Sequence, residues 1–362
     1  MINNLNLNLM KYAREKTLCS PITVDLEQKD VDLMYKTSIE VFSLLNSSSY
    51  NDFFQKNNLL KGSDVSHDLN FDKPLCAIGI DFHITPEGPK LIEINSNAGG
   101  LVTSALWAHR DKPEEAEKTL ALFVNSFSTE FQQKMNKKAL NMAIVDEDPY
   151  AQFTIYDLLL TQELMRFYDI ACDIVDSNSV VGTYDIIYNR TCDFLLNSEK
   201  SVHLNRAHDK NHNIVVPNPY MFTRVSDKRS LVTIYNFIRE NSEIFPAMNK
   251  TLLECMHIKD FVDSGLKRSG WFFKPGMAYG GTGVYRGRKI SMIKFQEIIQ
   301  QEFIAQRAAT PPTTTHLSED FKYDVRVFVW RDTIIDLSIR AYQGRITNFR
   351  TLNGGYTSYC IK

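Results

Sequence analysis

The sequence has little of what marks membrane, secreted or nucleic-acid-binding proteins. It contains no apolar run of about 18 residues, so we expect no membrane span, and its first residues lack the basic-then-apolar pattern of a signal peptide. The 41 basic and 43 acidic side chains leave a formal net charge of −2, so no overall field attracts nucleic acid or a lipid surface. We therefore expect neither nucleic acid nor a membrane among its partners.

Cysteine is also sparse. The six cysteines lie far apart in the sequence, and none forms a C-x-x-C pair of the kind that binds zinc. A chain of 362 residues can bury a substantial core and needs no disulfide staples. We expect reduced, mostly buried thiols and a cytoplasmic location.

The common nucleotide-binding fingerprints are absent too. The glycine-rich stretch 276–284 lacks the G-x-x-x-x-G-K-[ST] order of a P-loop, and no helix starts where a dinucleotide-binding turn requires one. Its lysine, Lys274, instead precedes the glycines, at the end of a predicted strand, 271–275. Such a flap can lie over phosphates, because glycine lets backbone N–H groups approach the oxygens closely. The alternative is an ordinary flexible hairpin tip.

The stretch 79–95 carries the clearest pattern. Apolar and polar residues alternate on both sides of a Pro-Glu-Gly turn, which predicts an antiparallel hairpin. With the turn centred on its glutamate, Asp81 faces Glu93, Asn95 lies on the same side, and Ile92 lies on the apolar face. Like charges directly opposite each other destabilise a sheet, and a divalent cation such as Mg²⁺ would explain them, because it binds hard oxygens. The alternative is the solvated outer face of an ordinary hairpin.

Hydrophobic spacing elsewhere predicts alternating helices and strands. Strand–helix–strand alternation after residue 140 indicates a parallel α/β unit. The polar segments 193–213 and 310–316 carry no pattern and are expected to be loops. The predicted helices are 29–47, one starting near 101, 113–137, 152–167, 228–239, 261–267 and 292–300. The predicted strands outside the hairpin are 22–24, 142–145, 170–175, 184–188, 271–275, 303–306, 323–330 and 333–342.

Taken together, the lysines, the glycine flap and the acidic hairpin resemble the ATP-grasp superfamily, which binds Mg²⁺ on an "acid … E-x-N" pair of strands. The resemblance implies that Asp81, Glu93 and Asn95 hold Mg²⁺. It also implies that Lys228 and Lys274 contact the phosphates of ATP.

The remaining matches concern ATP and the reacting acid. The resemblance places Gln306 beside adenine and adds Asp324 as a further nucleotide-binding residue. A local ion pair between Arg326 and Asp324, and an outward-facing Arg340, are the alternatives on those strands. The flap residues that match are Gly280, Gly281, Thr282 and Gly283. The residues expected to act on an acyl phosphate are Arg326, Arg340, Arg350 and Asn353.

Two departures from the superfamily pattern bear on these expectations. The acidic hairpin usually follows an Asn-Gly-Gly turn, whereas here it precedes residues 353–355, so the sequence resembles circularly permuted members such as glutathionylspermidine-synthase-like and glutathione-synthetase-like ligases. Some ligases also carry an arginine two residues before the first acid, where this chain has Gly79. The transition-state cation is then expected from Arg340 or Arg350.

The resemblance implies an α/β fold with α+β elements: a circularly permuted ATP-grasp core and a Rossmann-like pre-ATP-grasp domain. The expected division is 1–139, a permuted segment that completes the core; 140–215, the pre-ATP-grasp domain; and 216–362, the nucleotide-binding subdomains. Tyr188-Asn189-Arg190, at the end of the α/β unit, is a candidate lining of the substrate pocket.

The implied activity is an ATP- and Mg²⁺-dependent ligase that joins a small-molecule or peptide carboxylate to an amine, or to a thiol, through an acyl phosphate. A non-catalytic nucleotide-binding regulator and a kinase acting on a small molecule are the alternatives. The complete acidic set and both lysines argue against the regulator, while the sequence does not separate ligase from kinase. The identities of acid and amine, and a homodimeric state, are left open.

Overall fold

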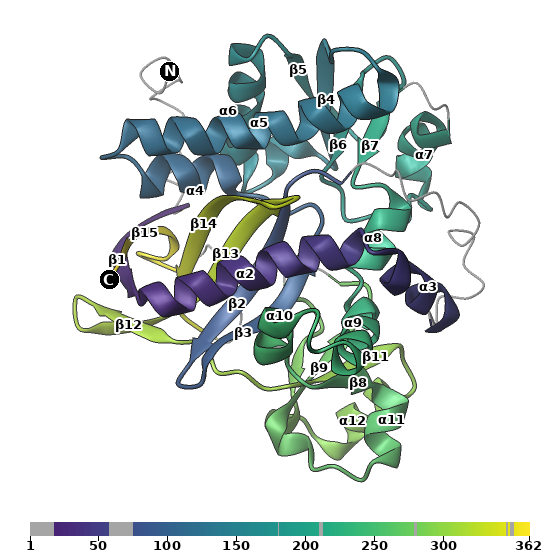
Figure 1. Cartoon of the computed structure of the whole chain (residues 1–362), viewed down its shortest axis with the longest axis vertical. Helices are drawn as coiled ribbons and strands as arrows, with labels where there is room; N and C mark the ends of the chain where they lie inside the picture. The colour runs from purple at the N-terminus through teal and green to yellow at the C-terminus, as the bar shows by residue number, and fades with distance from the viewer. Residues whose placement is uncertain are drawn as a thin grey trace.

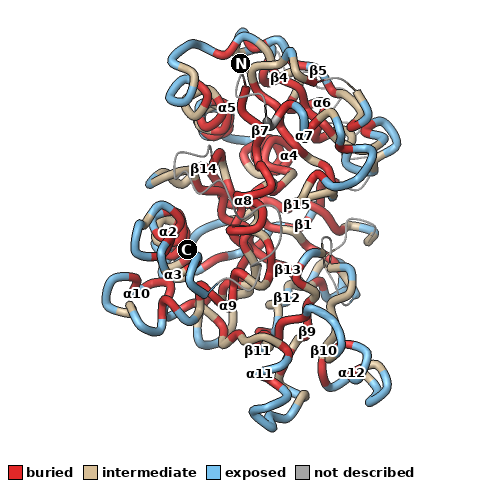
Figure 2. Tube along the Cα trace, turned by 90° about the vertical axis from the view of Figure 1, so that its right-hand side faces the viewer, coloured by how far each residue is buried: buried red, intermediate tan, exposed pale blue. Residues whose placement is uncertain are grey.

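The computed structural model describes residues 18–57, 75–179, 181–209, 213–278, 281–344, 347 and 351–362. This part of the chain forms three β-sheets with helices packed on them, a mixed α/β fold (Figure 1). Buried chain runs through the centre of the molecule, and exposed segments lie at its rim and lower end (Figure 2). None of the helices described is long and apolar enough to cross a membrane.

Several helices begin at a recognisable cap. Asp227, Asn218 and Ser291 each accept a hydrogen bond from a backbone N–H two or three residues further on, as N-cap residues do. The α-helices described are α2 (Gln28–Leu45), α3 (Ser48–Asn57), α4 (Leu101–Ala108), α5 (Pro113–Met135), α6 (Ile155–Phe167), α7 (Val202–Asp209), α8 (Pro219–Val225), α9 (Lys228–Glu240), α10 (Pro246–Thr251), α11 (Ile258–Asp263) and α12 (Met292–Ile299).

The largest sheet draws its strands from distant parts of the chain. Its order is β1-β15-β14-β13-β2-β3 with β12 beside β13; β1 and β15 run parallel, and the other pairs antiparallel. The strands are β1 (Cys19–Leu26), β2 (Ile78–Thr85), β3 (Gly88–Asn95), β12 (Thr313–His316), β13 (Glu319–Trp330), β14 (Thr333–Tyr342) and β15 (Gly355–Ile361).

The two faces of this sheet differ in chemistry, because successive side chains of a strand point to opposite sides. On one face, Val325 and Val327 of β13 pack with Ile80 of β2 in a core shared with α2, which lies across the sheet in Figure 1. Arg326, which alternates with these two valines along β13, lies on the opposite face. Phe328 lies on that face too and packs with α4 and α5. Those two helices cover part of this second face, and the polar site described below occupies another part.

The predicted α/β unit is confirmed as a four-stranded parallel sheet of order β5-β4-β6-β7. In such sheets the ligand crevice lies outside the carboxyl ends of the strands where the order reverses, which is here between β4 and β6. The strands are β4 (Asn141–Asp146), β5 (Ala171–Asp176), β6 (Ile186–Asn189) and β7 (Ile214–Val216).

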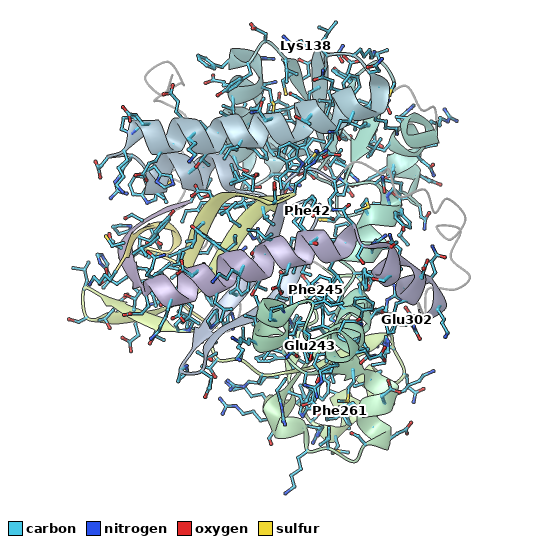
Figure 3. All side chains as sticks on the ribbon, viewed as in Figure 1. Phe42, Lys138, Glu243, Phe245, Phe261 and Glu302 are labelled. Atoms are coloured by element: carbon cyan, nitrogen blue, oxygen red, sulfur yellow. The ribbon has the colours of Figure 1, made fainter. Side chains whose placement is uncertain are left out.

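A third, antiparallel sheet of order β10-β9-β11-β8 has its own core. Phe261 of α11 packs there against Trp271 and Phe273, at the lower end of the molecule, whereas Phe42 and Phe245 belong to the large core above it (Figure 3). The strands are β8 (Cys255–His257), β9 (Trp271–Pro275), β10 (Tyr285–Arg286) and β11 (Phe303–Arg307).

The structure corrects several expectations about local structure. Helix α7 lies within 193–213, and strand β12 lies within 310–316, where the sequence predicts loops. Strand β15 follows the Asn-Gly-Gly turn, where no strand is predicted. Helix α11 begins at Ile258, three residues before the predicted start. Strand β15 carries little local signal because it pairs with the distant strand β1, whereas β12 pairs with β13, the next strand along the chain.

Candidate active site

A cavity of about 380 Å³ lies where the large sheet meets the small antiparallel one. Strands β2, β3, β13 and β14 line one side of it, and β9 and β11 line the other. The described residues that line it leave a net charge of +2, from five cationic side chains and three carboxylates, although one of the cations, Arg307, pairs with Glu254 outside the lining. The cationic residues are Lys228, Lys274, Arg307, Arg326 and Arg340, and the carboxylates are Asp81, Glu93 and Asp324. That balance suits an anionic ligand.

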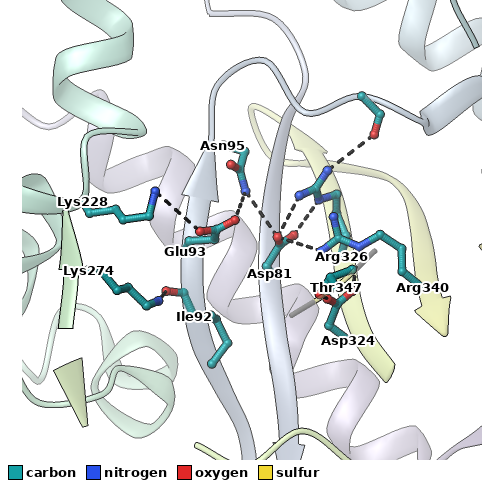
Figure 4. Close-up of polar contacts among 11 residues, drawn as sticks. Asp81, Ile92, Glu93, Asn95, Lys228, Lys274, Asp324, Arg326, Arg340 and Thr347 are labelled. Atoms are coloured by element: carbon teal, nitrogen blue, oxygen red, sulfur yellow. Dashed lines mark hydrogen bonds and ion pairs between the residues drawn. The ribbon is translucent and has the colours of Figure 1, made fainter. Parts of the chain in front are cut away.

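The acidic hairpin forms with the predicted register at its polar residues. Asp81 of β2 pairs with Glu93 of β3, and the amide Nδ2 of Asn95 lies 3.4 Å from a carboxylate oxygen of each. All three side chains line the cavity (Figure 4). The two carboxylates therefore do stand opposite each other, and each needs a source of compensating charge.

A β-bulge follows this pair. Phe82 pairs with Leu91, so Ile92 becomes the extra residue of β3. The prediction that Ile92 lies on the apolar face is therefore wrong, because Leu91 takes that place in the core and Ile92 lines the cavity. The bulge aims the carbonyl of Ile92 at the small sheet, where it accepts hydrogen bonds from Lys274 Nζ and Gln306 Nε2, both at 3.2 Å.

Two arginines from neighbouring strands hold Asp81 (Figure 4). Arg326 of β13 donates from Nε and Nη2 to the two Asp81 oxygens at 2.6 and 2.7 Å, and Arg340 of β14 donates from Nη2 at 2.8 Å. Arg340 Nε also donates to Asp324 at 2.6 Å, and the other Asp324 oxygen accepts from Thr347 Oγ1 at 2.5 Å. Four charged side chains thus form one row across three strands, each no more than 12% exposed.

These contacts fix the charge state of the row. Burial would raise the pKa of Asp81, but Arg326 and Arg340 lower it well below its usual range. Burial would likewise lower the pKa of Arg340, but its two carboxylate partners raise it. Asp81 and Arg340 therefore stay ionised at neutral pH, and two contacts from each arginine fix the plane of its guanidinium group.

Two lysines face this row from the other side of the cavity (Figure 4). Lys228 Nζ donates to the carbonyl of Ala278 at 2.6 Å and lies 3.9 Å from a Glu93 oxygen. Burial lowers the pKa of Lys274 to about 8, because the nearby Glu93 only partly offsets the loss of water. Both lysine side chains are less than a tenth exposed, and Lys228 lies within ion-pair distance of Glu93 while Lys274 donates to a neutral carbonyl. Positive charge is therefore left for a ligand to neutralise.

The start of α9 and the base of the glycine flap are tied together. Lys228 N donates to the carbonyl of Gly276, and Gly276 N donates to that of Glu302, both at 3.0 Å. Arg229 makes a two-pronged contact with Asp227 and also pairs with the Glu302 carboxylate. A Cβ on Gly276 would lie 2.7 Å from Arg229 Nε, so glycine lets the flap start against this arginine.

The other predicted nucleotide-binding residues are placed as follows. Gln306 and Gly281 line the cavity, with Gly281 at a φ of 72°, which favours glycine. Thr282 and Gly283 are described as part of the same flap but are not among the residues that line the cavity, and Thr282 is exposed. Gly280 lies outside the described residues.

The residues predicted to act on an acyl phosphate are also divided. Arg326 and Arg340 line the cavity, whereas Arg350 lies outside the described residues. Asn353 is described and does not line the cavity. It sits in a turn at a φ of 59°, where its carbonyl accepts a hydrogen bond from Ser20 Oγ at 2.7 Å.

The carboxyl edge of the parallel sheet meets the cavity at Asn97. Arg190, which follows β6, donates from Nη1 to the Asn97 carbonyl and lies over the Tyr188 ring, 5.3 Å from its centroid. Asp146 ends β4 beside it, and burial raises the pKa of this carboxyl to about 6 although Arg190 opposes the shift. The edge where a parallel sheet binds ligands therefore adjoins the cavity.

The donor set suits Mg²⁺ in part. Glu93 keeps 30% of its side chain exposed, and its carboxylate and the Asn95 amide oxygen are hard donors of the kind that Mg²⁺ takes together with phosphate oxygens. Asp81 already has both oxygens on arginines. Across the described ranges, no group of three or more His, Cys, Asp or Glu side chains is placed to hold a metal ion. Glu93 and Asn95 are the residues that fit.

Sequence reasoning missed several residues of the cavity. Phe272 and Arg307 come from the small sheet, two residues before the predicted Lys274 and one residue after the predicted Gln306. Asn97 comes two residues after the predicted E-x-N motif. That proximity could have indicated Asn97. Thr347, the partner of Asp324, lies in a loop whose contact depends on the folded sheet, and no local signal marks it.

The fold is similar to those of two solved synthetase-like proteins. A glutathione synthetase-like effector from Globodera pallida, solved in apo form, has a TM-score of 0.62 at 11% sequence identity, over 98% of this chain and 96% of that one. A γ-glutamylcysteine synthetase-like protein from Methylobacillus flagellatus KT has a TM-score of 0.50 at 9% identity, over 88% and 84%. A D-cycloserine synthetase matches 47% of this chain and 59% of its own, with a TM-score of 0.32 and 10% identity, too low to support an argument.

No protein-family model matches the sequence, and no curated protein matches it at a significant level. Identities this low establish the fold alone. The activity has to be argued from the residues of the cavity.

Proposed function

We propose that this protein is an ATP- and Mg²⁺-dependent ligase that joins a carboxylate to an amine, or to a thiol, through an acyl phosphate. The observation that carries the proposal is the placement of Lys228 and Lys274, two buried lysine side chains that line one cavity together with the Glu93 carboxylate. A triphosphate carries negative charge that both lysines can neutralise. The synthetase-like fold supports the reaction class.

Each side of the cavity then has a role. Lys228 and Lys274 hold phosphate oxygens, the flap that contains Gly281 covers them with backbone N–H groups, and Gln306 lies beside the base. Glu93 and Asn95 would hold Mg²⁺, which would offset phosphate charge during transfer of the γ-phosphoryl group.

The arginine side of the cavity would receive the acid. Arg326 and Arg340 orient a substrate carboxylate, one oxygen of which attacks the γ-phosphorus while ADP leaves. The amine nitrogen then attacks the carbonyl carbon, phosphate leaves with the electron pair of the C–O bond, and the amine proton passes to solvent. The fixed cations offset the negative charge that develops, so the protein contributes position and electrostatics and not a covalent nucleophile.

We interpret the chain order as a circular permutation of the ATP-grasp core. Pairing of β1 with β15 and of β2 with β13 in one sheet supports this, because early segments complete a sheet otherwise made of late ones. The parallel sheet would be the pre-ATP-grasp domain. Its edge at Asp146 and Arg190 adjoins the cavity, where the acid or the amine would enter.

Turnover with trapped product tests the proposal. The protein is incubated with ATP, Mg²⁺ and a panel of amino acids and short peptides, with and without hydroxylamine. A ligase yields ADP, free phosphate and a hydroxamate only when an acid is present. A kinase yields ADP and a phosphorylated substrate without free phosphate, and a regulator binds ATP without turnover.

The matched variants are Glu93→Gln and Glu87→Gln, which change the same charge on one hairpin. Glu93 lines the cavity, whereas Glu87 is exposed at the turn. We expect Glu93→Gln to remove phosphate release while the protein stays folded, and Glu87→Gln to keep full turnover. Unchanged turnover in Glu93→Gln would refute the assignment of this carboxylate.

A further inference from the structure

We propose that Asp81, together with the bare backbone of Gly79, positions Arg326 and Arg340 for the anionic group of the substrate, and that Asp81 does not bind the metal. Glu93 is then the carboxylate that serves Mg²⁺. This inference deepens the proposed function and rests on it for the identity of the ligands.

The first observation is that the oxygens of Asp81 are already engaged. They accept three charged hydrogen bonds, two from Arg326 and one from Arg340, and Asn95 Nδ2 stands 3.4 Å from one of them. A carboxylate offers about four lone-pair positions, so little is left for a metal ion. Coordination would displace a guanidinium group and leave a buried arginine without its partner, which is strongly unfavourable.

The second observation is the space above Gly79. Asp81 and Gly79 are two residues apart on β2 and so point to the same face. A Cβ at Gly79 would lie 2.9 Å from Arg326 Cδ and 2.5 Å from Ala98 Cβ. The side chain of Arg326 therefore passes over the bare backbone of Gly79 on its way to Asp81. Gly79 leaves space for the side chain, and Asp81 provides the negative charge that it contacts.

The third observation concerns charge balance. Two arginines and two aspartates make the row neutral as a whole, and Arg307 pairs with Glu254, so the excess positive charge of the cavity comes from Lys228 and Lys274. The row thus serves orientation more than attraction. A bidentate contact with Asp81 holds the guanidinium plane of Arg326, and contacts with Asp81 and Asp324 hold that of Arg340. Such preorganised donors stabilise charge that develops in a reaction.

The test reads the contact directly in the wild-type protein. Arginine is labelled with ¹⁵N, and the Nε–H signals of Arg326 and Arg340 are assigned from Arg326→Lys and Arg340→Lys. Exchange with water is then measured for the free protein, with a non-hydrolysable ATP analogue alone, and with the analogue plus Mg²⁺. We expect the Arg326 Nε–H to exchange slowly in all three states. Faster exchange that appears only with Mg²⁺ would overturn the proposal, because Asp81 would then have moved to the metal.

Variants supply the second readout. Binding of Mn²⁺ in the presence of the ATP analogue, followed by electron paramagnetic resonance, should weaken by about tenfold or more in Glu93→Gln and by less than about twofold in Asp81→Asn. Asp81→Asn should also lose the slow exchange of the Arg326 Nε–H. If that variant does not fold, the double variant Asp81→Asn with Arg340→Gln is used in its place. It removes one negative and one positive charge together, so the row stays neutral.

The outcomes separate the two proposals. Equal loss of Mn²⁺ in Asp81→Asn, or in the double variant, and in Glu93→Gln would overturn the assignment of Asp81 as a positioning residue. A wild-type protein that binds no metal–nucleotide complex would refute the proposed function. The exchange of the Arg326 Nε–H in wild type and in Asp81→Asn would still decide whether Asp81 and Gly79 hold this arginine.

Discussion

Arg326 lies directly over Gly79 of the neighbouring strand, with its Cδ 2.9 Å from where a Cβ of Gly79 would stand. Some ligases of the superfamily that this sequence resembles carry an arginine at the position of Gly79. In this chain a guanidinium group comes from Arg326 of β13 and donates to Asp81. We therefore propose that Arg326 joins Arg340 as a source of the cation that the sequence leads us to expect from Arg340 or Arg350.

Gly79→Ala should destabilise the protein by about 1–3 kcal/mol, because the added methyl group meets both Arg326 and Ala98 in a packed site. Urea unfolding monitored by circular dichroism measures the free energy of unfolding. Gly182→Ala is the control, since a Cβ at Gly182 meets nothing within 4 Å. Equal stability of the two variants would mean that Arg326 does not lie over Gly79.

Lys274 should take up a proton when a nucleotide binds. Its pKa is lowered to about 8 by burial, so near pH 8.5 much of the free protein carries a neutral amine. Bound phosphate would raise this pKa, so binding should take up protons at about pH 8.5 and fewer at about pH 7, where the ammonium group is already charged.

Calorimetry in two buffers of different ionisation enthalpy counts those protons. Lys274→Met should remove the uptake, while Lys118→Met, at an exposed site on α5, should keep it. Proton uptake that persists in Lys274→Met would assign it to another group and would contradict the placement of the phosphates.

Asp146→Asn should stabilise the protein above about pH 6 and leave it unchanged near pH 4. Burial raises the pKa of Asp146 to about 6, above the value of about 3.9 in an unfolded chain. The folded state therefore holds this proton more tightly, and stability falls as the pH rises from about 4 to about 6. Because the carboxyl is only partly buried, we expect a gain of about 1–2 kcal/mol.

Urea unfolding of Asp146→Asn and wild type across that pH range measures the difference. Asp169→Asn, at an exposed turn, is the control and should follow the wild-type profile. A constant difference between Asp146→Asn and wild type at all pH values would show that the ionisation of Asp146 carries no cost in the folded protein.

Much of the fold follows from local patterns that are strong in the sequence. Strict alternation predicts the hairpin and its pairing of Asp81 with Glu93, and dense apolar runs predict strands β9 and β14 with the bounds that the structure has. Asp227 predicts the start of α9, because a carboxylate at that position caps the first turn. Each of these features is determined by residues only a few positions away in the sequence.

The rest depends on contacts that no local pattern encodes. The bulge at Ile92 turns a carbonyl toward Lys274 from a different sheet, and β15 is paired by β1, where Cys19 lies opposite Tyr356. The salt bridges of Asp81 were hidden for the same reason, since both arginines come from β13 and β14. The motif spacing predicts Asp81 as a site residue, but only the folded sheet shows that its oxygens contact two arginines.

The most direct test of the central claim is a crystal structure with a non-hydrolysable ATP analogue and Mg²⁺. We predict that the β- and γ-phosphates lie within hydrogen-bond distance of Lys228 and Lys274 Nζ, and that the metal lies about 2.1 Å from a Glu93 oxygen while Asp81 stays on Arg326 and Arg340. A triphosphate bound outside this cavity, or turned away from both lysines, would contradict the claim that these segments form one ATP site.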